Sequence, residues 1–299
     1  MSSATEAVLD ASSTLNEAAP AKVNLALHVT GRRTDGYHFL DTLAVFTDFG
    51  DQVLVESDGS DRFLVSGPFA AAVPSGPDNL VTCARDLVRR IATRPCPPVR
   101  ITLEKNIPAA SGLGGGSSDA AATLRALDRH WQLGLGEQRL RDTALVLGAD
   151  LPMCLAARPV RASGIGEILE PVSKLPALDM VLINPGIEVA TPAVFAALER
   201  RDSNPLPAPP HSLSRTALLD WLASTRNDLE APARSIAPDI GTVLSALRES
   251  GASFARMSGS GATCFGLFAD AASAAHATAA IAKQQPGWFA IATRTRPSP

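Results

Sequence analysis

The sequence is poor in cysteine and in long apolar runs. Its four cysteines are widely spaced among 299 residues, at Cys83, Cys96, Cys154 and Cys264. They form neither the C-x-x-C spacing of a zinc or redox site nor the dense pattern of a disulfide scaffold. No apolar stretch approaches the roughly 20 residues that span a bilayer. We therefore expect reduced, buried thiols and a cytoplasmic protein that does not cross a membrane.

An excess of positive charge is also missing. Lys and Arg number 27 against 30 Asp and Glu, which gives a formal net charge of −3, and no segment is a run of basic residues. This argues against a nucleic-acid surface. If the substrates are phosphorylated, their attraction must come from a local site.

The first 18 residues lack the features of a targeting segment. They have no basic start and no apolar middle, so they do not form a secretory signal, and they contain no Arg, unlike a transit peptide. We expect residues 1–18 to be a flexible leader.

The rest of the chain has the composition and length of a two-lobed globular protein. Apolar residues make up 45% of the sequence and charged residues 19%. Patterns of alternating and helical spacing interleave without a regular strand–helix repeat, which favours an α+β fold over a doubly wound sheet. The expected strands are residues 23–29, 40–46, 52–56, 99–104, 180–183, 254–257 and 263–268, and the clearest expected helices are 78–92, the one opening at 117, and 236–250.

The strongest motif is a glycine-rich loop over residues 108–118 that runs directly into an expected helix. Four glycines within five positions leave the backbone open to a ligand, so that successive N–H groups can converge on an anion at the start of the helix. Ser111, Ser117 and Ser118 can add hydroxyl groups that donate to a phosphate or offer oxygens to a magnesium ion. A flexible linker would be the alternative, but linkers do not usually end in a capped amphipathic helix.

Two familiar phosphate motifs do not fit this loop. It has no Gly-Lys-Ser/Thr, so it is not a Walker loop, and Ser117 or Asp119 stands where a dinucleotide fingerprint needs its third glycine. A second glycine turn, residues 257–263, is weak evidence alone, because an ordinary β-turn would use the same residues. If it is functional, it closes over the phosphates or packs against the first loop.

Residues suited to phosphoryl transfer occur at two places. Lys22 and Asn24 project from the same face of the first expected strand, and Asp150 lies at a helix end just before a proline. A carboxylate at that position can orient and deprotonate a hydroxyl, and a nearby lysine keeps it ionised. Isolated Lys and Asp residues are more often solvated surface groups, so this pairing is a hypothesis.

Aromatic residues are scarce as well, at 5% of the chain, and Tyr37 is the only tyrosine. It sits beside His38 in an expected loop, where its ring can stack on a base while His38 hydrogen-bonds the base edge. Structural packing of Tyr37 explains the local sequence equally well. Phe195, just after Thr191, is a further candidate, with a core position at a helix start as the default.

Together these motifs resemble the superfamily of galactokinase, homoserine kinase, mevalonate kinase and phosphomevalonate kinase, the GHMP kinases. Its three marker segments occur in order, around Lys22, at 108–118 and at 257–263. Within it, the chain is most similar to the branch that phosphorylates a cytidine diphosphate-linked polyol in non-mevalonate isoprenoid biosynthesis. The six strings that carry this resemblance lie at residues 19–25, 30–38, 112–119, 147–152, 164–167 and 227–230.

The resemblance implies a two-lobed fold with the active site in the cleft between the lobes, and ATP as the phosphoryl donor with Mg²⁺. Lys22 and Asp150 would be the catalytic pair, and Asn24, Tyr37, His38, Thr191 and Phe195 would contact the cytidine-bearing substrate. The ATP phosphates would be bound by the loop residues Pro108, Ala109, Ala110, Ser111, Gly112, Leu113, Gly114, Gly115, Gly116, Ser117 and Ser118.

Domain limits follow from the same resemblance. The ATP-binding domain is expected over residues 19–165 and the C-terminal domain over 166–299, with the last element as a candidate to return to the first lobe. The chain departs from many relatives after Asp150, where Met153 to Arg158 replace an apolar pair followed by two glycines. This change could bring Arg158 near the substrate phosphates.

Three alternatives stay open, of which a Rossmann oxidoreductase is disfavoured by the glycine spacing. The resemblance itself leaves the other two. One is another GHMP-type kinase, acting on a mevalonate-type, homoserine or sugar substrate. Tyr37 and His38 count against it, because those substrates have no cytosine ring. The other is a non-catalytic nucleotide-binding regulator, which the presence of both Lys22 and Asp150 disfavours.

Overall fold

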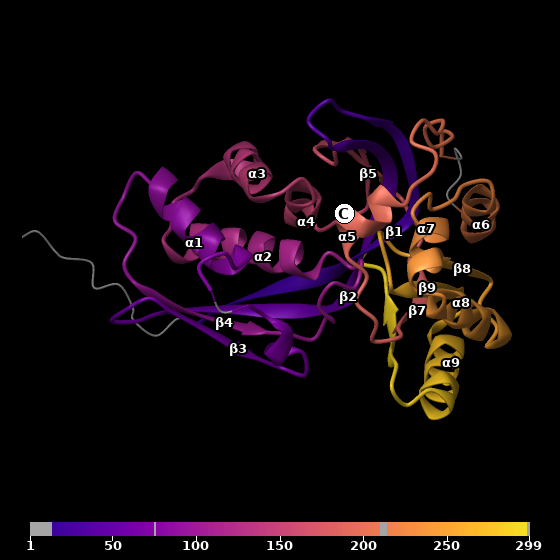
Figure 1. Cartoon of the computed structure of the whole chain (residues 1–299). Coiled ribbons are helices and arrows are strands. Elements are labelled where there is room, and N and C mark those ends of the chain that lie inside the picture. Colours follow the sequence, from indigo (N-terminus) through magenta and orange to yellow (C-terminus); the bar gives the residue numbers. More distant parts are fainter. Residues whose placement is uncertain (1–13, 75, 210–213, 298–299) are drawn as a thin grey trace, which may run out of the picture.

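The computed structural model describes residues 14–74, 76–209 and 214–297 (Figure 1). They form two lobes, each built on one β-sheet with helices packed against it. The predicted α+β, two-lobed architecture is confirmed.

The first lobe is built on a six-stranded sheet in the order β3-β4-β2-β5-β6, with β1 paired to β2. The long strand β2 organises it: its first half pairs with β5, its second half pairs with β4, and β1 runs antiparallel along nearly all of it. The strands are β1 (Leu15–Arg32), β2 (His38–Ser57), β3 (Arg62–Ser66), β4 (Val99–Glu104), β5 (Val160–Gly164) and β6 (Ile168–Pro171). The two strands predicted over 40–46 and 52–56 are therefore a single strand.

Four helices cover one face of this sheet (Figure 1). They are α1 (Leu80–Ile91), α2 (Gly115–His130), α3 (Gly136–Leu147) and α4 (Leu151–Ala156), and a 3-10 turn, η1 (Ala70–Ala72), precedes α1. Leu124 and Leu127 of α2 pack with Val53 and Ile101 of the sheet in a core that is fully closed to solvent. This packing fixes α2, and with it the glycine loop at its start.

The predicted flexible leader needs a correction. Residues 1–13 lie outside the described part of the chain, but residues 15–18 belong to β1, where Leu15 pairs with Val55. Glu17 explains why the strand begins so early: its carboxylate accepts a 2.7 Å hydrogen bond from Arg125 of α2 and also pairs with Arg129. An acidic residue read as part of a solvated leader thus anchors the first strand.

The second lobe is built on a four-stranded antiparallel sheet in the order β10-β7-β9-β8. Its strands are β7 (Asp179–Asn184), β8 (Phe254–Met257), β9 (Cys264–Phe268) and β10 (Phe289–Arg294), and its helices are α5 (Thr191–Ala196), α6 (Arg215–Ala223), α7 (Glu230–Ile236), α8 (Asp239–Glu249) and α9 (Ala271–Gln284). Within the described ranges, every helix is too short or too polar to cross a membrane.

The two lobes share one apolar core. Val23 and Leu25 of β1 turn away from the cleft and pack with Met180, Leu182 and Phe265 of the second sheet, all of them closed to solvent. Side chains alternate along β1, so one face of the strand packs in the core shared by the lobes and the other face lines the cleft. Because β1 packs against both sheets, it fixes the position of its cavity-facing residues relative to both lobes.

The predicted domain boundary between residues 165 and 166 falls inside the β5–β6 hairpin. Because β6 pairs with β5, the first sheet extends to Pro171, and we propose the change of lobe between Pro171 and Asp179. The last strand, β10, stays in the second sheet. The residues after it return to the first lobe, where the N–H of Arg296 donates to the carbonyl of Phe46 at 2.7 Å.

Arg125 ties β1, α2 and α4 together, and we expect Arg125→Met to destabilise the fold by about 2–4 kcal/mol. Besides its bond to Glu17, its guanidinium donates to the carbonyls of Ala18, Cys154 and Leu155 at 2.9–3.1 Å. Burial lowers the pKa of Arg125 to about 10, so it is still charged at neutral pH. The free energy of unfolding in urea measures the loss.

Arg129→Met is the matched control. Arg129 pairs with the same Glu17, but 56% of its side chain is exposed, so its loss should cost less than about 1 kcal/mol. Equal destabilisation by the two variants would contradict the anchoring role of Arg125.

Candidate active site

One large cavity lies between the lobes, with a volume of about 1080 Å³. It is lined by β1 and β2, the loop between them, the start of α1, the glycine loop, the segment joining α3 to α4, α5 and the second glycine turn. A pocket for one small ligand typically measures about 300–1,000 Å³, so this cavity is slightly larger than that range.

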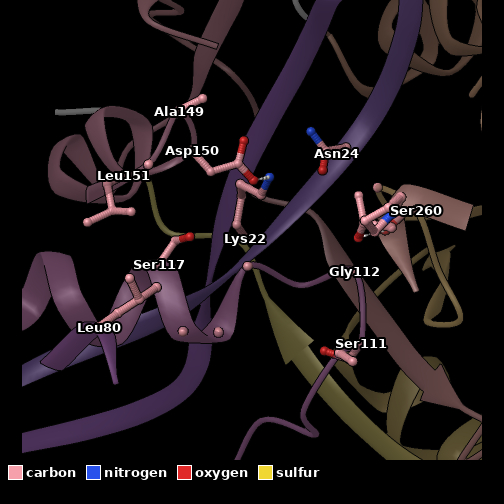
Figure 2. Close-up of a pocket in the computed structure, with 18 of the residues that line it drawn as sticks. Lys22, Asn24, Leu80, Ser111, Gly112, Ser117, Ala149, Asp150, Leu151 and Ser260 are labelled. Atoms are coloured by element: carbon pink, nitrogen blue, oxygen red, sulfur yellow. Dashed lines mark hydrogen bonds and ion pairs between the residues drawn. The ribbon is translucent and has the colours of Figure 1, made fainter. Parts of the chain in front are cut away.

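An ion pair between Lys22 and Asp150 lies in the middle of this cavity (Figure 2). The Lys22 ammonium is 2.7 Å from a carboxylate oxygen of Asp150. Lys22 comes from β1, and its side chain is only 6% exposed, whereas Asp150 lies between α3 and α4 with 41% of its side chain open to solvent. The structure thus brings together two residues that are 128 positions apart in the chain.

The environment keeps Lys22 charged. Burial alone lowers the pKa of the Lys22 ammonium, but the facing carboxylate of Asp150 outweighs it, and the pKa is raised. A fixed positive charge therefore lies under the more exposed carboxylate. Such an arrangement can hold a hydroxyl group at Asp150 and stabilise negative charge that develops beside it.

The glycine loop packs closely against this pair, and two of its positions have no room for a side chain. Gly114 has a left-handed backbone (φ 64°) and caps α2, and a Cβ there would lie 3.1 Å from Lys22 Cε. A Cβ at Gly112 (φ 75°) would come within 2.4 Å of the carbonyl oxygen of Ser258. Backbone bonds fix the loop further, from Lys22 N–H to Leu113 O at 2.9 Å and from Thr263 N–H to Ser111 O at 3.1 Å.

Most of the predicted phosphate loop faces the cavity, but two members do not. Leu113 is fully buried in the shared core, and the hydroxyl of Ser118 donates to the carbonyl of Pro20 at 2.8 Å in a closed position. Their side chains therefore hold the loop in place and do not line the cavity, and phosphate binding by the loop stays a prediction. The residues that line the cavity are Pro108, Ala109, Ala110, Ser111, Gly112, Gly114, Gly115, Gly116 and Ser117.

The lining part of the loop has free donors for an anion. The hydroxyls of Ser111 and Ser117 form no hydrogen bond with any residue in the described ranges. The first N–H groups of α2 have no partner within the helix, and the helix dipole adds about half a positive charge at this end. Phosphate groups fit such an environment.

The second glycine turn packs directly on the first loop. The hydroxyl of Ser258 donates to the carbonyl of Gly112 at 3.0 Å, and the N–H of Asn24 donates to the same hydroxyl at 3.1 Å. Gly259 and Ser260 of this turn line the cavity. Of the roles considered for this turn, packing against the first loop is the one observed.

A buried charge cluster beside the loop was not predicted. The Lys105 ammonium is 2.5 Å from a carboxylate oxygen of Asp51 and 2.7 Å from one of Asp119. Burial raises the pKa of Asp119 well above its ordinary value, while the two carboxylates raise the pKa of Lys105 against the effect of burial. Lys105 and Asp119 line the cavity beside the start of α2. Asp119 follows the loop directly in sequence, but nothing in the sequence pairs it with Lys105.

An apolar slot at the first-lobe end of the cavity was missed as well. Its walls include Val73, Pro74, Leu80, Val81 and Leu103. Figure 2 shows Leu80 on the side of the ion pair opposite Asn24 and Ser260. The sequence signal for this wall was Asn79, which caps the start of α1 by accepting from Val81 N–H at 2.8 Å and so positions Leu80 and Val81. A planar base can lie in this slot, next to the phosphate loop.

The predicted aromatic group lies at the other end of the cavity. The ring of His38 stacks on Phe195 of α5, with centroids 4.7 Å apart and planes 20° apart. Tyr37 lines the same region, with 58% of its surface exposed. An exposed aromatic ring at a cavity wall is available to a ligand, whereas structural packing would have buried it.

The polar groups at this end are poised for a ligand. The Nε2 atom of His38 is buried and has no hydrogen-bond partner among the described residues, and burial together with Arg32 and Arg201 lowers the pKa of this histidine. His38 is therefore neutral at pH 7, when one ring nitrogen donates and the other accepts. Arg32 and Arg201 also line the cavity, which the sequence did not indicate.

Asn24 and Thr191 complete this wall. Asn24 donates to the hydroxyl of Thr42 at 2.8 Å, but its own side-chain oxygen is buried and unpartnered within the described chain. Thr191 shares a 2.8 Å hydrogen bond with Ser260 of the second glycine turn. Arg158, by contrast, does not line the cavity; its guanidinium lies 3.6 Å from Glu137.

Comparisons with known proteins agree with this geometry. The family model of the GHMP kinase N-terminal domain matches residues 79–158, and that of the GHMP kinase C-terminal domain matches residues 214–287. A 4-diphosphocytidyl-2-C-methyl-D-erythritol kinase of Chelativorans sp. (strain BNC1) is 55% identical over 281 residues, which cover 94% of this chain and 96% of that protein. The enzyme of the same name from Brucella melitensis is 54% identical, covering 97% and 98%.

Solved structures give the same result. The crystal structure of a 4-(cytidine 5'-diphospho)-2C-methyl-D-erythritol kinase superimposes with a TM-score of 0.78 at 36% identity, covering 94% of this chain and 99% of that one. A homoserine kinase from Cytophaga hutchinsonii has a TM-score of 0.68 at 18% identity, covering 99% and 97%, and shares the fold alone. The chain belongs to the GHMP kinase family and, within it, to the 4-diphosphocytidyl-2-C-methyl-D-erythritol kinases.

Proposed function

We propose that this enzyme transfers the γ-phosphoryl group of ATP to the 2-hydroxyl of 4-diphosphocytidyl-2-C-methyl-D-erythritol and releases ADP, as a step of non-mevalonate isoprenoid biosynthesis. The observation that carries the proposal is the position of the Lys22–Asp150 pair. It lies in the same cavity as the glycine loop and the wall of Asn24, Tyr37, His38 and Phe195. A donor and an acceptor bound at the two ends meet at this pair.

Asp150 receives the proton of the attacking hydroxyl. Its carboxylate is the more exposed member of the pair, so an acceptor hydroxyl can reach it while Lys22 stays buried below. Lys22 keeps the carboxylate oriented and offsets the negative charge that gathers as the oxygen attacks phosphorus. Phosphoryl transfer asks a protein mainly for such positioning and charge stabilisation.

The glycine loop binds the phosphates of ATP. Ser111, Ser117 and the N–H groups at the start of α2 supply the donors, while Asp51 and Asp119 balance the charge of Lys105 beside them. The apolar slot around Leu80 takes the adenine ring. The ion pairs of Lys105 with Asp51 and Asp119 then hold the first turn of α2 against the sheet.

Mg²⁺ fits this site as the partner of ATP. Among the described residues there is no group of three or more His, Cys, Asp or Glu that could hold a metal ion. Magnesium in kinases needs no such cage, because it keeps several waters and binds the substrate phosphates and only one or two protein oxygens. The hydroxyl oxygens of Ser111 and Ser117, unpartnered within the described chain, are the protein oxygens that would hold it. When bound, Mg²⁺ neutralises charge on the β- and γ-phosphates.

The cytosine ring binds at the opposite end, against Tyr37, His38 and Phe195. Neutral His38 offers hydrogen bonds to the base edge, and Asn24 and Thr191 add polar contacts from the two lobes. A mevalonate-type, homoserine or sugar substrate would leave this wall unused. Buried polar atoms without partners cost free energy, so the wall selects a ligand that satisfies them.

Turnover of competing substrates tests this function. With Mg²⁺ and ATP, we expect ADP release with the diphosphocytidyl methylerythritol and a product heavier by one phosphate, measured by mass spectrometry. Mevalonate, homoserine and galactose should give no release above the background. Preferential turnover of one of these three would contradict the assigned role of Tyr37 and His38 while leaving the kinase chemistry intact.

Replacing the proton acceptor tests the chemistry. Asp150→Asn should lower kcat by about 10²–10⁴-fold, because an amide cannot accept the proton, while the KM for ATP should stay within about threefold. Asp142→Asn makes the same chemical change at an exposed position of α3 and is the control. Thermal unfolding of both variants shows whether the protein still folds once Lys22 loses its partner. A folded Asp150→Asn variant with near-normal kcat would remove Asp150 from the proposed role.

A further inference from the structure

A second cavity lies on the C-terminal lobe, away from the proposed active site. Its volume is about 580 Å³, within the range of small-molecule sites. It is formed by the end of α6, α7, the end of α8 and strand β8. None of its lining residues lines the active-site cavity.

Positive charge is concentrated in this cavity. Four of its lining residues are arginines, Arg226, Arg234, Arg248 and Arg256, and one is an acid, Glu230, so the lining carries a formal charge of 4 − 1 = +3. The whole chain carries −3. A local field of this sign in a concave site concentrates anions.

Three of these arginines form an exposed rim. Arg234 and Arg248 form no hydrogen bond or ion pair with any residue of the described ranges. Arg226 pairs with Asp228 through Nε at 2.5 Å, and 52% of its side chain is exposed, which leaves its terminal nitrogens open. A guanidinium group whose terminal nitrogens are unpaired can give two parallel hydrogen bonds to a phosphate.

The floor of the cavity adds a buried positive charge. Arg256 is only 8% exposed, and its terminal nitrogens donate to the carbonyls of Leu25, Leu222 and Thr225 at 2.6–3.0 Å. Burial lowers the pKa of Arg256 to about 10, which still leaves it charged at neutral pH. Carbonyl groups satisfy its hydrogen bonds, and the nearby carboxylate of Glu230 offsets part of its positive charge, so the rim arginines supply most of the attraction for an anion.

The only acidic residue of the lining is already engaged. A carboxylate oxygen of Glu230 accepts a hydrogen bond from the N–H of Met257 at 3.1 Å. It therefore does not close the cavity by pairing with the rim. The rest of the lining consists of alanines, Phe254, Asn227 and Ser253, and the Arg256 guanidinium lies 4.6 Å from the centre of the Phe254 ring. An organic group attached to a phosphate can lie against this part of the lining.

We propose that this cavity is a second binding site, for a small molecule that carries a phosphate or diphosphate group. Repulsion among uncompensated arginines costs stability unless an anion relieves it. The charges surround one hollow that opens to solvent and do not follow a stripe, which fits a small anion better than a nucleic acid. Asn227 of the lining donates to the carbonyls of Met257 and Gly259 at 2.8 Å, so the site borders the glycine turn that reaches the active site.

Calorimetric titration with inorganic pyrophosphate tests the site. The active site is first filled with a non-hydrolysable ATP analogue and Mg²⁺, and the wild-type chain is then compared with the double variant Arg234→Gln/Arg248→Gln. We expect binding to the wild type, and a Kd at least about tenfold higher in the double variant. Inorganic phosphate should bind more weakly than pyrophosphate, because it reaches fewer arginines at once.

The control is the double variant Arg62→Gln/Arg141→Gln, which removes the same charge from two first-lobe arginines outside both cavities. It should bind pyrophosphate like the wild type. Absence of binding, an unchanged Kd in the Arg234/Arg248 variant, or an equal loss in the control would overturn the proposal. The comparison of variants decides the result even if pyrophosphate also enters the active site, so failure here is distinct from failure of the proposed kinase function.

Discussion

The ion pair between Lys22 and Asp150 is the interaction on which the site depends. Lys22 is almost closed to solvent, and a charge in that position is tolerated only because a carboxylate lies 2.7 Å away. The fold supplies the two partners from separate elements, a strand shared by both lobes and the junction of two helices. Any change in the relative position of these elements would separate the pair, so the architecture of the first lobe and the chemistry are coupled.

Backbone contacts around this pair connect the lobes. Lys22 N–H holds the glycine loop, the loop accepts a hydrogen bond from Ser258, and Ser258 accepts one from Asn24. This circuit joins β1, the start of α2 and the second glycine turn within a few residues. The glycine loop and the Asn24 wall of the cavity are therefore held together by one hydrogen-bonded centre.

Local patterns in the sequence predicted much of this arrangement. Alternation along β1 placed Lys22 and Asn24 on one face, and both residues line the cavity. The dense glycines before a helix indicated a phosphate site, which stays a prediction. Leu113 and Ser118 were assigned to the ligand because a motif does not reveal which of its side chains turn inward. Glu17 was assigned to a leader because its partners, Arg125 and Arg129, lie more than 100 residues away.

The cluster of Lys105, Asp51 and Asp119 and the arginine-lined cavity were beyond prediction for the same reason. Each is assembled by tertiary packing from residues that look like ordinary surface charges in sequence. The meeting of Lys22 and Asp150 was likewise only a hypothesis until the fold brought them together. The roles of the individual site residues, and the cytoplasmic location expected from cysteine usage, stay predictions.

A crystal structure with a non-hydrolysable ATP analogue, Mg²⁺ and the diphosphocytidyl methylerythritol tests the central claim most directly. The account predicts the substrate 2-hydroxyl within about 2.6–3.2 Å of the Asp150 carboxylate, with the γ-phosphate on the side of the glycine loop and the cytosine ring between Tyr37 and Phe195. A bound substrate whose hydroxyl lies away from Asp150, or whose cytosine ring lies outside this wall, would contradict it.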